Sequence, residues 1–334
     1  MPGRAMERAD LGDPVSGADP STLRIDANAK INLTLRVIGH RPDGYHELET
    51  LMVPISLADR LDVHADADPK RFRTLSLSLE VTGQADLIRD VPLGETNLVL
   101  AAARALAEHV EARGFAHILL EKRVPSAAGL GGGSADAAAT LRALNRLWRC
   151  GLDTKALARI GAGVGSDVPA LVAGQAAVAQ GRGEFVRPVE AASFEWVLRI
   201  FPFGVRTADA FRWWDEDGCP SGRGDPAAVI EAVRSSDVNA LGRALFNDLE
   251  EPVVRRYPEI REAKEVLVAH GAAGAVMCGS GPTVAALLPE EADVSLRGTI
   301  RVGSLSANRP GGWLAPHDSN VDLRDQNPAS LPLD

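Results

Sequence analysis

A glycine-rich segment in the first half of the chain has the composition of a phosphate-binding loop. Glycine allows the backbone to approach a ligand closely and to point successive N–H groups toward it. The flanking residues predict a strand before this segment and a helix after it, so the positive end of the helix dipole would face the same point. A glycine-rich structural turn would have the same composition, and that alternative stays open. The segment reads Pro125-Ser126-Ala127-Ala128-Gly129-Leu130-Gly131-Gly132-Gly133-Ser134-Ala135.

The spacing of this segment excludes two common phosphate loops. A Walker loop requires GxxxxGK[ST], and the chain contains no Gly-Lys dipeptide. A dinucleotide-binding fingerprint requires GxGxxG, but when it is counted from Gly129 and Gly131, the third glycine position is Ser134. The segment therefore indicates a third kind of phosphate loop.

A lysine and an aspartate are the candidates for chemistry at such a site. Lys30 lies inside an otherwise apolar strand, where an unpaired charge is costly, and Asp167 follows a glycine-rich stretch. Transfer of a γ-phosphoryl group to an alcohol requires held phosphates, an aligned hydroxyl and an acceptor for its proton. If the two side chains meet, Asp167 could act as the base and Lys30 could stabilise the forming alkoxide. Otherwise Asp167 only caps a helix, and Lys30 reaches solvent from the strand end.

Other side chains beside these motifs could bind the rest of a substrate. Tyr45 and His46 follow a tight turn and place a flat ring next to an imidazole, although packing within a strand would explain them equally simply. Asn32 lies two residues after Lys30 and therefore on the same face of the strand. Lys122 directly precedes the glycine-rich segment. It is a candidate for a phosphate or nucleotide contact, or else a solvated lysine at a strand end.

The apolar patterns predict strands and helices without a regular βαβ alternation, which favours an α+β fold with a domain boundary near residues 180–195. Gly114 is placed to end the first long helix, residues 161–165 indicate a loop, and the segment with Trp213 and Trp214 looks irregular. Strands are expected over about 31–37, 75–81, 116–121, 196–201, 273–278 and 283–288, and helices over about 97–113, 134–148 and 258–270, with another starting at Asp225-Pro226.

Composition narrows the class of protein. The chain has 334 residues, of which 45% are hydrophobic and 24% charged, as in an ordinary globular enzyme. Its net charge of −9 argues against nucleic acid as a partner, because non-specific binding needs a basic surface. No apolar stretch approaches the roughly 18–20 residues of a membrane span, and the first residues lack a signal-peptide core. A cytoplasmic protein without membrane partners is expected.

The cysteines and the two ends of the chain suggest no further chemistry. Cys150, Cys219 and Cys278 are odd in number and form no CxxC pair, so reduced thiols in or near the core are expected. Residues 1–22 and 306–334 are polar and rich in Gly, Pro and Asp, which is typical of disordered extensions.

Five motifs, in one order over about residues 25–290, resemble those of the GHMP kinases. The triple glycine followed by serine is similar to the branch of that family that acts on a cytidine-diphosphate-linked methylerythritol. Asn28 and Ala128 depart from the usual family residues, proline and glycine, at positions whose side chains do no chemistry. The motifs are Ala29-Lys30-Ile31-Asn32-Leu33, Arg41-Pro42-Asp43-Gly44-Tyr45-His46-Glu47-Leu48, residues 125–138 (PSAAGLGGGSADAA), Gly165-Ser166-Asp167-Val168-Pro169 and Gly279-Ser280-Gly281-Pro282-Thr283.

The resemblance implies a two-domain α+β fold. A ribosomal-protein-S5-like ATP-binding domain would span residues 23–185, and a ferredoxin-like domain would span residues 186–305. It also implies ATP and Mg²⁺ as cofactors and phosphorylation of the substrate's 2-hydroxyl. That reaction is a step of the non-mevalonate route to isopentenyl diphosphate. The enzyme would be a monomer or a homodimer that acts on a small molecule.

The resemblance assigns roles to particular residues. Lys30 and Asp167 would be catalytic, and the metal ligands remain unassigned. ATP would contact Lys122 and residues 125–135, where Ser134 would offer its hydroxyl to a phosphate or to Mg²⁺. The substrate would contact Asn32, Tyr45, His46, Thr207 and Phe211, with the base stacked between Tyr45 and Phe211.

Two other functions would fit parts of this sequence. Another GHMP kinase would act on homoserine, mevalonate or a sugar, but those substrates need no cytosine pocket of the kind that the RPDGYHEL motif implies. A non-catalytic protein on the same fold would be expected to lose Lys30 or Asp167, and this chain has both.

Overall fold

The computed structural model describes residues 21–306 apart from 220–223, 291, 293 and 295. Most of the two predicted extensions, 1–22 and 306–334, therefore lies outside the described residues. At the N-terminal boundary the prediction is wrong by one residue, because Thr22 already belongs to the first strand and pairs with His64.

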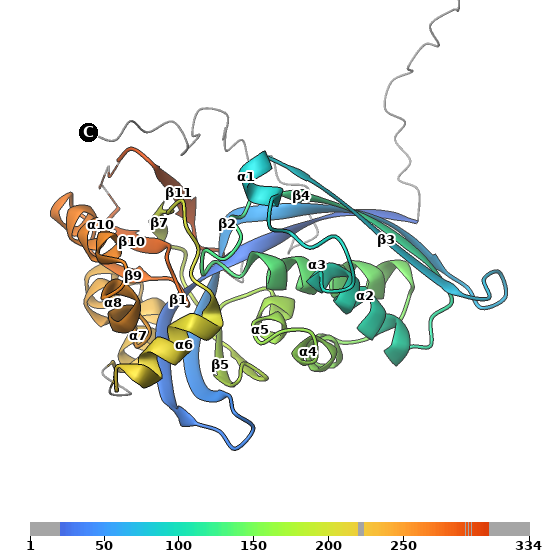
Figure 1. Cartoon of the computed structure of the whole chain (residues 1–334), viewed down its shortest axis with the longest axis horizontal. Coiled ribbons are helices and arrows are strands. Elements are labelled where there is room, and N and C mark those ends of the chain that lie inside the picture. The colour runs from blue at the N-terminus through green and yellow to red at the C-terminus, as the bar shows by residue number, and fades with distance from the viewer. Residues whose placement is uncertain (1–20, 220–223, 291, 293, 295, 307–334) are drawn as a thin grey trace, which may run out of the picture.

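A seven-stranded sheet forms the larger part of the protein (Figure 1). Its strands run in the order β3-β4-β2-β1-β8, and β5 pairs with β2 and β6 with β5. A tight turn at residues 41–45 joins β1 to β2, and the amide of Gly44 donates to the carbonyl of Arg41 over 3.1 Å, as the turn motif predicts. The strands are β1 (Thr22–His40), β2 (His46–Ala67), β3 (Leu75–Gly83), β4 (Gly114–Lys122), β5 (Ala177–Gly181), β6 (Phe185–Pro188) and β8 (Phe246–Asn247).

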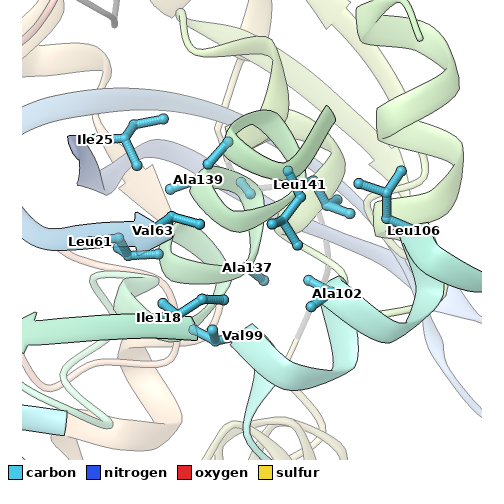
Figure 2. Packing of buried hydrophobic residues seen from close by; sticks show 14 of the residues in the cluster. Ile25, Leu61, Val63, Val99, Ala102, Leu106, Ile118, Ala137, Ala139 and Leu141 are labelled. Carbon is cyan, nitrogen blue, oxygen red and sulfur yellow. The ribbon is translucent and has the colours of Figure 1, made fainter. Parts of the chain in front are cut away.

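Four helices cover one face of this sheet (Figure 1). Figure 2 shows small residues of α3, such as Ala137 and Ala139, between the strands and α2. Alanine at these positions allows α3 to lie close to its neighbours, and α3 carries the glycine-rich segment at its start. The helices are α2 (Leu98–His109), α3 (Gly132–Leu147), α4 (Thr154–Ala162) and α5 (Val168–Ala173); the short α1 (Ala85–Ile88) follows β3.

A four-stranded antiparallel sheet in the order β11-β7-β10-β9 forms the second part. A shared apolar cluster joins it to the larger sheet, because Ile31 and Val53 of β1 and β2 pack with Trp196 and Leu287 of β7 and β10. The elements of this part are β7 (Glu195–Arg199), α6 (Thr207–Glu216), α7 (Pro226–Ser235), α8 (Val238–Ala244), α9 (Glu250–Val254), α10 (Pro258–Ala269), β9 (Gly274–Met277), β10 (Val284–Leu288) and β11 (Thr299–Gly303).

The α+β class is confirmed, and three local predictions are wrong. Gly114 begins β4 instead of ending α2, which stops at His109. Gly161 lies inside α4, where a Cβ would approach the side chain of Val168 to 2.7 Å. The segment with Trp213 and Trp214 is helical and forms α6.

No helix within the described part of the chain is long and apolar enough to cross a membrane. The three cysteines are free, and burial raises the pKa of the Cys278 thiol to about 12, so this thiol stays protonated near neutral pH.

Candidate active site

The glycine-rich segment connects β4 to α3, as predicted. Gly129 and Gly131 have φ angles of 78° and 69°, a backbone region that strongly favours glycine. Gly131 is the N-cap of α3 and provides no side-chain hydrogen bond to the helix. Because the first N–H groups of a helix have no intrahelical acceptor, they are available to bind a phosphate.

A second glycine turn, Gly279–Thr283, packs against this loop. The amide of Thr283 donates to the carbonyl of Ala128 over 3.3 Å, and a Cβ on Gly129 would overlap the carbonyl oxygen of Cys278. The side-chain amide of Asn247 donates to the carbonyls of Met277 and Gly279, each over 2.7 Å. The second turn therefore fixes the position of the first.

The contact between the two turns predicts a stability effect. Gly129→Ala adds a methyl group at a positive φ and against a backbone carbonyl, and we expect a loss of about 2–4 kcal/mol in the free energy of unfolding. Gly133→Ala is the matched control in the same glycine-rich segment, in the first turn of α3, because its Cβ would lie 3.6 Å from Leu98 Cδ1, an ordinary contact. Chemical denaturation of both variants measures the difference. Equal stabilities would contradict the packing described here.

Lys30 and Asp167 meet at the floor of a cleft. Lys30 Nζ lies 3.4 Å from Asp167 Oδ2 and donates to the carbonyl of Gly129 over 2.8 Å and to Asn32 Oδ1 over 2.7 Å. The Lys30 side chain is 4% exposed and that of Asp167 is 34% exposed. The lysine is therefore buried among partners instead of reaching solvent, and the carboxylate remains accessible to a ligand.

The simpler explanation of Asp167 as a helix cap does not hold. Asp167 occupies the N-cap position of α5, but its side chain makes no capping hydrogen bond. The carboxylate faces Lys30 instead. Asn32, which Lys30 contacts, donates in turn to Thr50 Oγ1 over 2.8 Å, so a chain of hydrogen bonds across β1 and β2 orients the lysine.

Lys122 lies beneath the glycine-rich loop and is buried, contrary to the solvated alternative. Its ammonium contacts Asp59 of β2 and, over 2.9 Å, Asp136 of α3. Burial opposes the charge of Lys122, but Asp136 and Asp59 raise the pKa of its ammonium. Burial, together with the charge of Asp59, raises the pKa of the Asp136 carboxyl well above its usual range. Lys122 thus connects the sheet to the helix that begins at the loop.

A cleft of about 940 Å³ contains most of the predicted site residues. Leu130 and Ala135 are the exceptions, because both are buried in the apolar core. The predicted residues that line the cleft are Lys30, Asn32, Tyr45, His46, Lys122, Pro125, Ser126, Ala127, Ala128, Gly129, Gly131, Gly132, Gly133, Ser134, Asp167, Thr207 and Phe211.

The aromatic residues form one wall of this cleft. The rings of His46 and Phe211 are stacked with centroids 4.6 Å apart, and the guanidinium of Arg182 lies 4.7 Å from the ring centre of Tyr45. His46 Nε2 lies 2.9 Å from Asp215 Oδ1. Thr207 begins α6, and its hydroxyl lies 3.2 Å from that of Ser280 in the second glycine turn.

Several residues that shape the site were not predicted from the sequence. Asp59, Thr50 and Asp215 lie far along the chain from the residues they contact, and nothing in their local sequence marks them. Asp136 was visible within the glycine motif, and a carboxylate on the apolar first turns of a helix could have indicated a buried partner.

Comparisons with known proteins show the family to which the chain belongs. Residues 97–175 match the family model described as GHMP kinases N terminal domain, and residues 229–296 match GHMP kinases C terminal. A 4-diphosphocytidyl-2-C-methyl-D-erythritol kinase of Brevibacillus brevis is 39% identical over 84% of this chain and 94% of its own length. The protein of the same name from Pelotomaculum thermopropionicum is 44% identical over 77% of this chain and 86% of its own length.

Solved structures of similar proteins indicate the same family. A crystal structure of 4-(cytidine 5'-diphospho)-2C-methyl-D-erythritol kinase matches with a TM-score of 0.63 and 36% identity, over 79% of this chain and 90% of that one. A homoserine kinase from Cytophaga hutchinsonii has a TM-score of 0.61 at 16% identity, over 89% of this chain and 98% of that one, which shows a common fold alone. With relatives of this identity and coverage, the chain belongs to the GHMP kinase family and, within it, to the family of 4-diphosphocytidyl-2-C-methyl-D-erythritol kinases.

Proposed function

We propose that this protein transfers the γ-phosphoryl group of ATP to the 2-hydroxyl of 4-diphosphocytidyl-2-C-methyl-D-erythritol, a step of the non-mevalonate route to isopentenyl diphosphate. One observation carries the proposal. The Lys30–Asp167 pair lies in the same cleft as the uncapped start of α3 and the His46–Phe211 wall. The cleft thus combines a phosphate cradle, a candidate base and an aromatic surface for a nucleobase.

Asp167 is suited to receive the proton of the attacking hydroxyl. Its carboxylate is partly exposed to the cleft and makes no capping hydrogen bond that would compete for its oxygens. Lys30, held by Asn32 and the carbonyl of Gly129, places a positive charge beside the oxygen that becomes an alkoxide. General-base assistance of this kind is typically worth about 10²–10⁴ in rate, and the fixed charge adds to it.

The start of α3 is suited to bind the phosphates of ATP. The backbone from Gly131 to Ser134 lines the cleft at the positive end of a 16-residue helix. Mg²⁺ prefers oxygen ligands and usually combines one or two protein groups with substrate phosphates. The donor chemistry here fits that preference, because Ser134, which carries a hydroxyl, lines the same cleft. Ser134 would hold the ion together with the phosphates, and Mg²⁺ would offset their charge.

The aromatic wall is suited to the cytosine ring. We expect Phe211→Ala to raise KM for the cytidyl substrate roughly 5- to 150-fold, equivalent to the about 1–3 kcal/mol of one base–aromatic contact, with kcat and KM for ATP little changed. Phe185→Ala is the matched control, because Phe185 is a 64% exposed aromatic outside the cleft lining. Steady-state kinetics with either substrate varied tests this. An unchanged KM for the cytidyl substrate would remove Phe211 from the binding site.

We also propose the division into an ATP-binding part, residues 23–185, and a second part, residues 186–305. The four helices α2 to α5 all precede residue 186 and the whole β11-β7-β10-β9 sheet follows it, while β6 (Phe185–Pro188) of the larger sheet crosses the boundary. This division is consistent with the cleft, which is lined from both parts.

The experiment that tests the proposed function is an initial-rate assay with ATP and Mg²⁺. Diphosphocytidyl-methylerythritol, homoserine, mevalonate and galactose are offered separately as acceptors. Turnover of the cytidyl substrate alone supports the proposal. Turnover of another alcohol would support a kinase but contradict the assignment of the cytidyl substrate. Binding of ATP without any turnover would favour a non-catalytic protein.

A further inference from the structure

Two histidines and an aspartate meet at the edge of the aromatic wall. His40 ends β1 and His46 begins β2, and the two are direct partners across the hairpin. Asp215 reaches them from α6, and its Oδ1 lies 3.1 Å from His40 Nε2 and 2.9 Å from His46 Nε2. The ligand atoms that the three side chains offer all lie within 4.8 Å of one another.

The donors and spacings fit a transition-metal ion. Zinc bonds to imidazole nitrogen and carboxylate oxygen at about 2.0–2.2 Å, so two ligand atoms of one tetrahedral ion lie about 3.3 Å apart. The two N–O distances are close to that value, and small side-chain movements would admit an ion between the three atoms. Imidazole ligands favour zinc, nickel or copper, whereas magnesium and calcium prefer oxygen ligands.

The neighbouring side chains hold the three candidate ligands in place and leave the cluster accessible to an ion from solvent. The ring of His46 is stacked on Phe211, and its centroid lies 4.5 Å from that of His40. The side chain of His46 is 11% exposed, whereas that of His40 is 62% exposed. One face of the cluster is therefore fixed by packing, and the other is open to solvent for an entering ion and for water as a fourth ligand.

We propose that His40, His46 and Asp215 form a binding site for a divalent transition-metal ion of the zinc class. The ion would link the β1–β2 hairpin to α6 and would bind to His46 Nε2. Because His46 and Asp215 line the cleft, the bound ion would compete with the cytidyl alcohol but not with ATP. The competition rests on the proposed function, whereas metal binding by the free protein does not.

The binding test uses the full chain after dialysis against a chelator and titration with CoCl₂, followed by displacement with ZnCl₂. Tetrahedral cobalt absorbs in the visible range, so binding is observed without any enzymatic assay. We expect His40→Ala to weaken binding by at least about 10-fold, since even residues outside the ligand set cost about 10- to 100-fold. His270→Ala is the matched control, because this exposed histidine contacts the carbonyl of Val266 at the end of α10, away from the cluster.

Asp215→Asn separates a metal site from a hydrogen-bonded cluster. An asparagine still accepts a hydrogen bond from His46 but is a poor zinc ligand, so we expect it to keep the fold, as judged by circular dichroism, and to lose cobalt binding. Cobalt binding that is absent in the wild type, or unchanged in His40→Ala and Asp215→Asn, would overturn the site.

The kinetic test asks whether the site faces the substrate. Zinc should raise KM for the cytidyl alcohol and leave KM for ATP unchanged, and His40→Ala, whose side chain does not line the cleft, should keep turnover and lose this inhibition. Inhibition competitive with ATP, or inhibition retained by His40→Ala, would contradict competition between the bound ion and the cytidyl alcohol. If the protein does not turn over the cytidyl alcohol at all, the proposed function fails, and the cobalt titration still decides the metal site.

Discussion

Asp167→Asn is expected to lower kcat about 10²–10⁴-fold while ATP affinity stays near that of the wild type. Asparagine has the size of aspartate but cannot accept the proton of the attacking hydroxyl. The Asp167 carboxylate lies 3.4 Å from Lys30 Nζ and makes no hydrogen bond to its own helix, so its loss should leave α5 intact. Single-turnover kinetics and a nucleotide-binding titration measure the two quantities separately.

Asp153→Asn provides the matched control for a simple capping role. Asp153 caps α4, where its Oδ1 accepts from the amide of Ala156 over 2.7 Å, and asparagine caps helices about as well as aspartate. We expect this variant to keep both its stability and its turnover. If Asp167→Asn behaved like Asp153→Asn and kept most of its turnover, Asp167 would not be the base.

Lys122→Met is expected to lower the free energy of unfolding by about 3–5 kcal/mol, the usual cost of removing one partner from a buried ion pair. The side chains of Asp59 and Asp136 are 0% and 4% exposed, so neither carboxylate could turn to solvent once the ammonium is gone. Asp59 would keep the amides of Arg123 and Val124 as donors, over 2.6 and 2.8 Å, whereas Asp136 Oδ1 already has no hydrogen-bond partner. Urea denaturation measures the loss.

Asp136→Asn is the matched control for this cluster. Because the folded-state pKa of Asp136 is raised above its usual 3.8, the folded protein binds this proton more tightly than the unfolded chain does. Its contribution to stability is therefore fully present below pH 3.8 and is lost as pH rises through the raised pKa. Asparagine cannot titrate, so we expect the stability of the variant to depend less on pH than that of the wild type, as urea denaturation at several pH values would measure. An equally steep loss of stability with rising pH in the variant would contradict a raised pKa of Asp136.

Most of the residues that line the cleft could be predicted because the chain groups them in short motifs. Lys30 and Asn32 are two residues apart on β1, so their side chains lie on the same face of the strand, the face toward the cleft. The glycine-rich segment lies between a strand and a helix, and the structure has β4 and α3 there. Local sequence therefore specified which side chains enter the cleft, since both periodicity and turn geometry are local properties.

The supporting contacts depend on tertiary packing and could not be predicted. Gly161 resembles a loop residue in sequence, yet it lies within α4 because Val168 of α5 leaves no room for a Cβ. Asp59 belongs to β2, a 22-residue strand whose sequence did not suggest its length, and its contact with Lys122 spans 63 positions of the chain. Such contacts follow from strand order and helix placement, which a single sequence does not specify.

The central claim is tested most directly by following the phosphorus atoms of a single reaction by ³¹P nuclear magnetic resonance. The protein is given ATP, Mg²⁺ and diphosphocytidyl-methylerythritol, with homoserine, mevalonate and galactose present as competitors. We predict one new phosphomonoester on the cytidyl compound, with its diphosphate intact and an equal amount of ADP. ADP without a phosphomonoester, or a phosphomonoester on one of the competitors, would contradict the assignment of this cleft to the cytidyl alcohol.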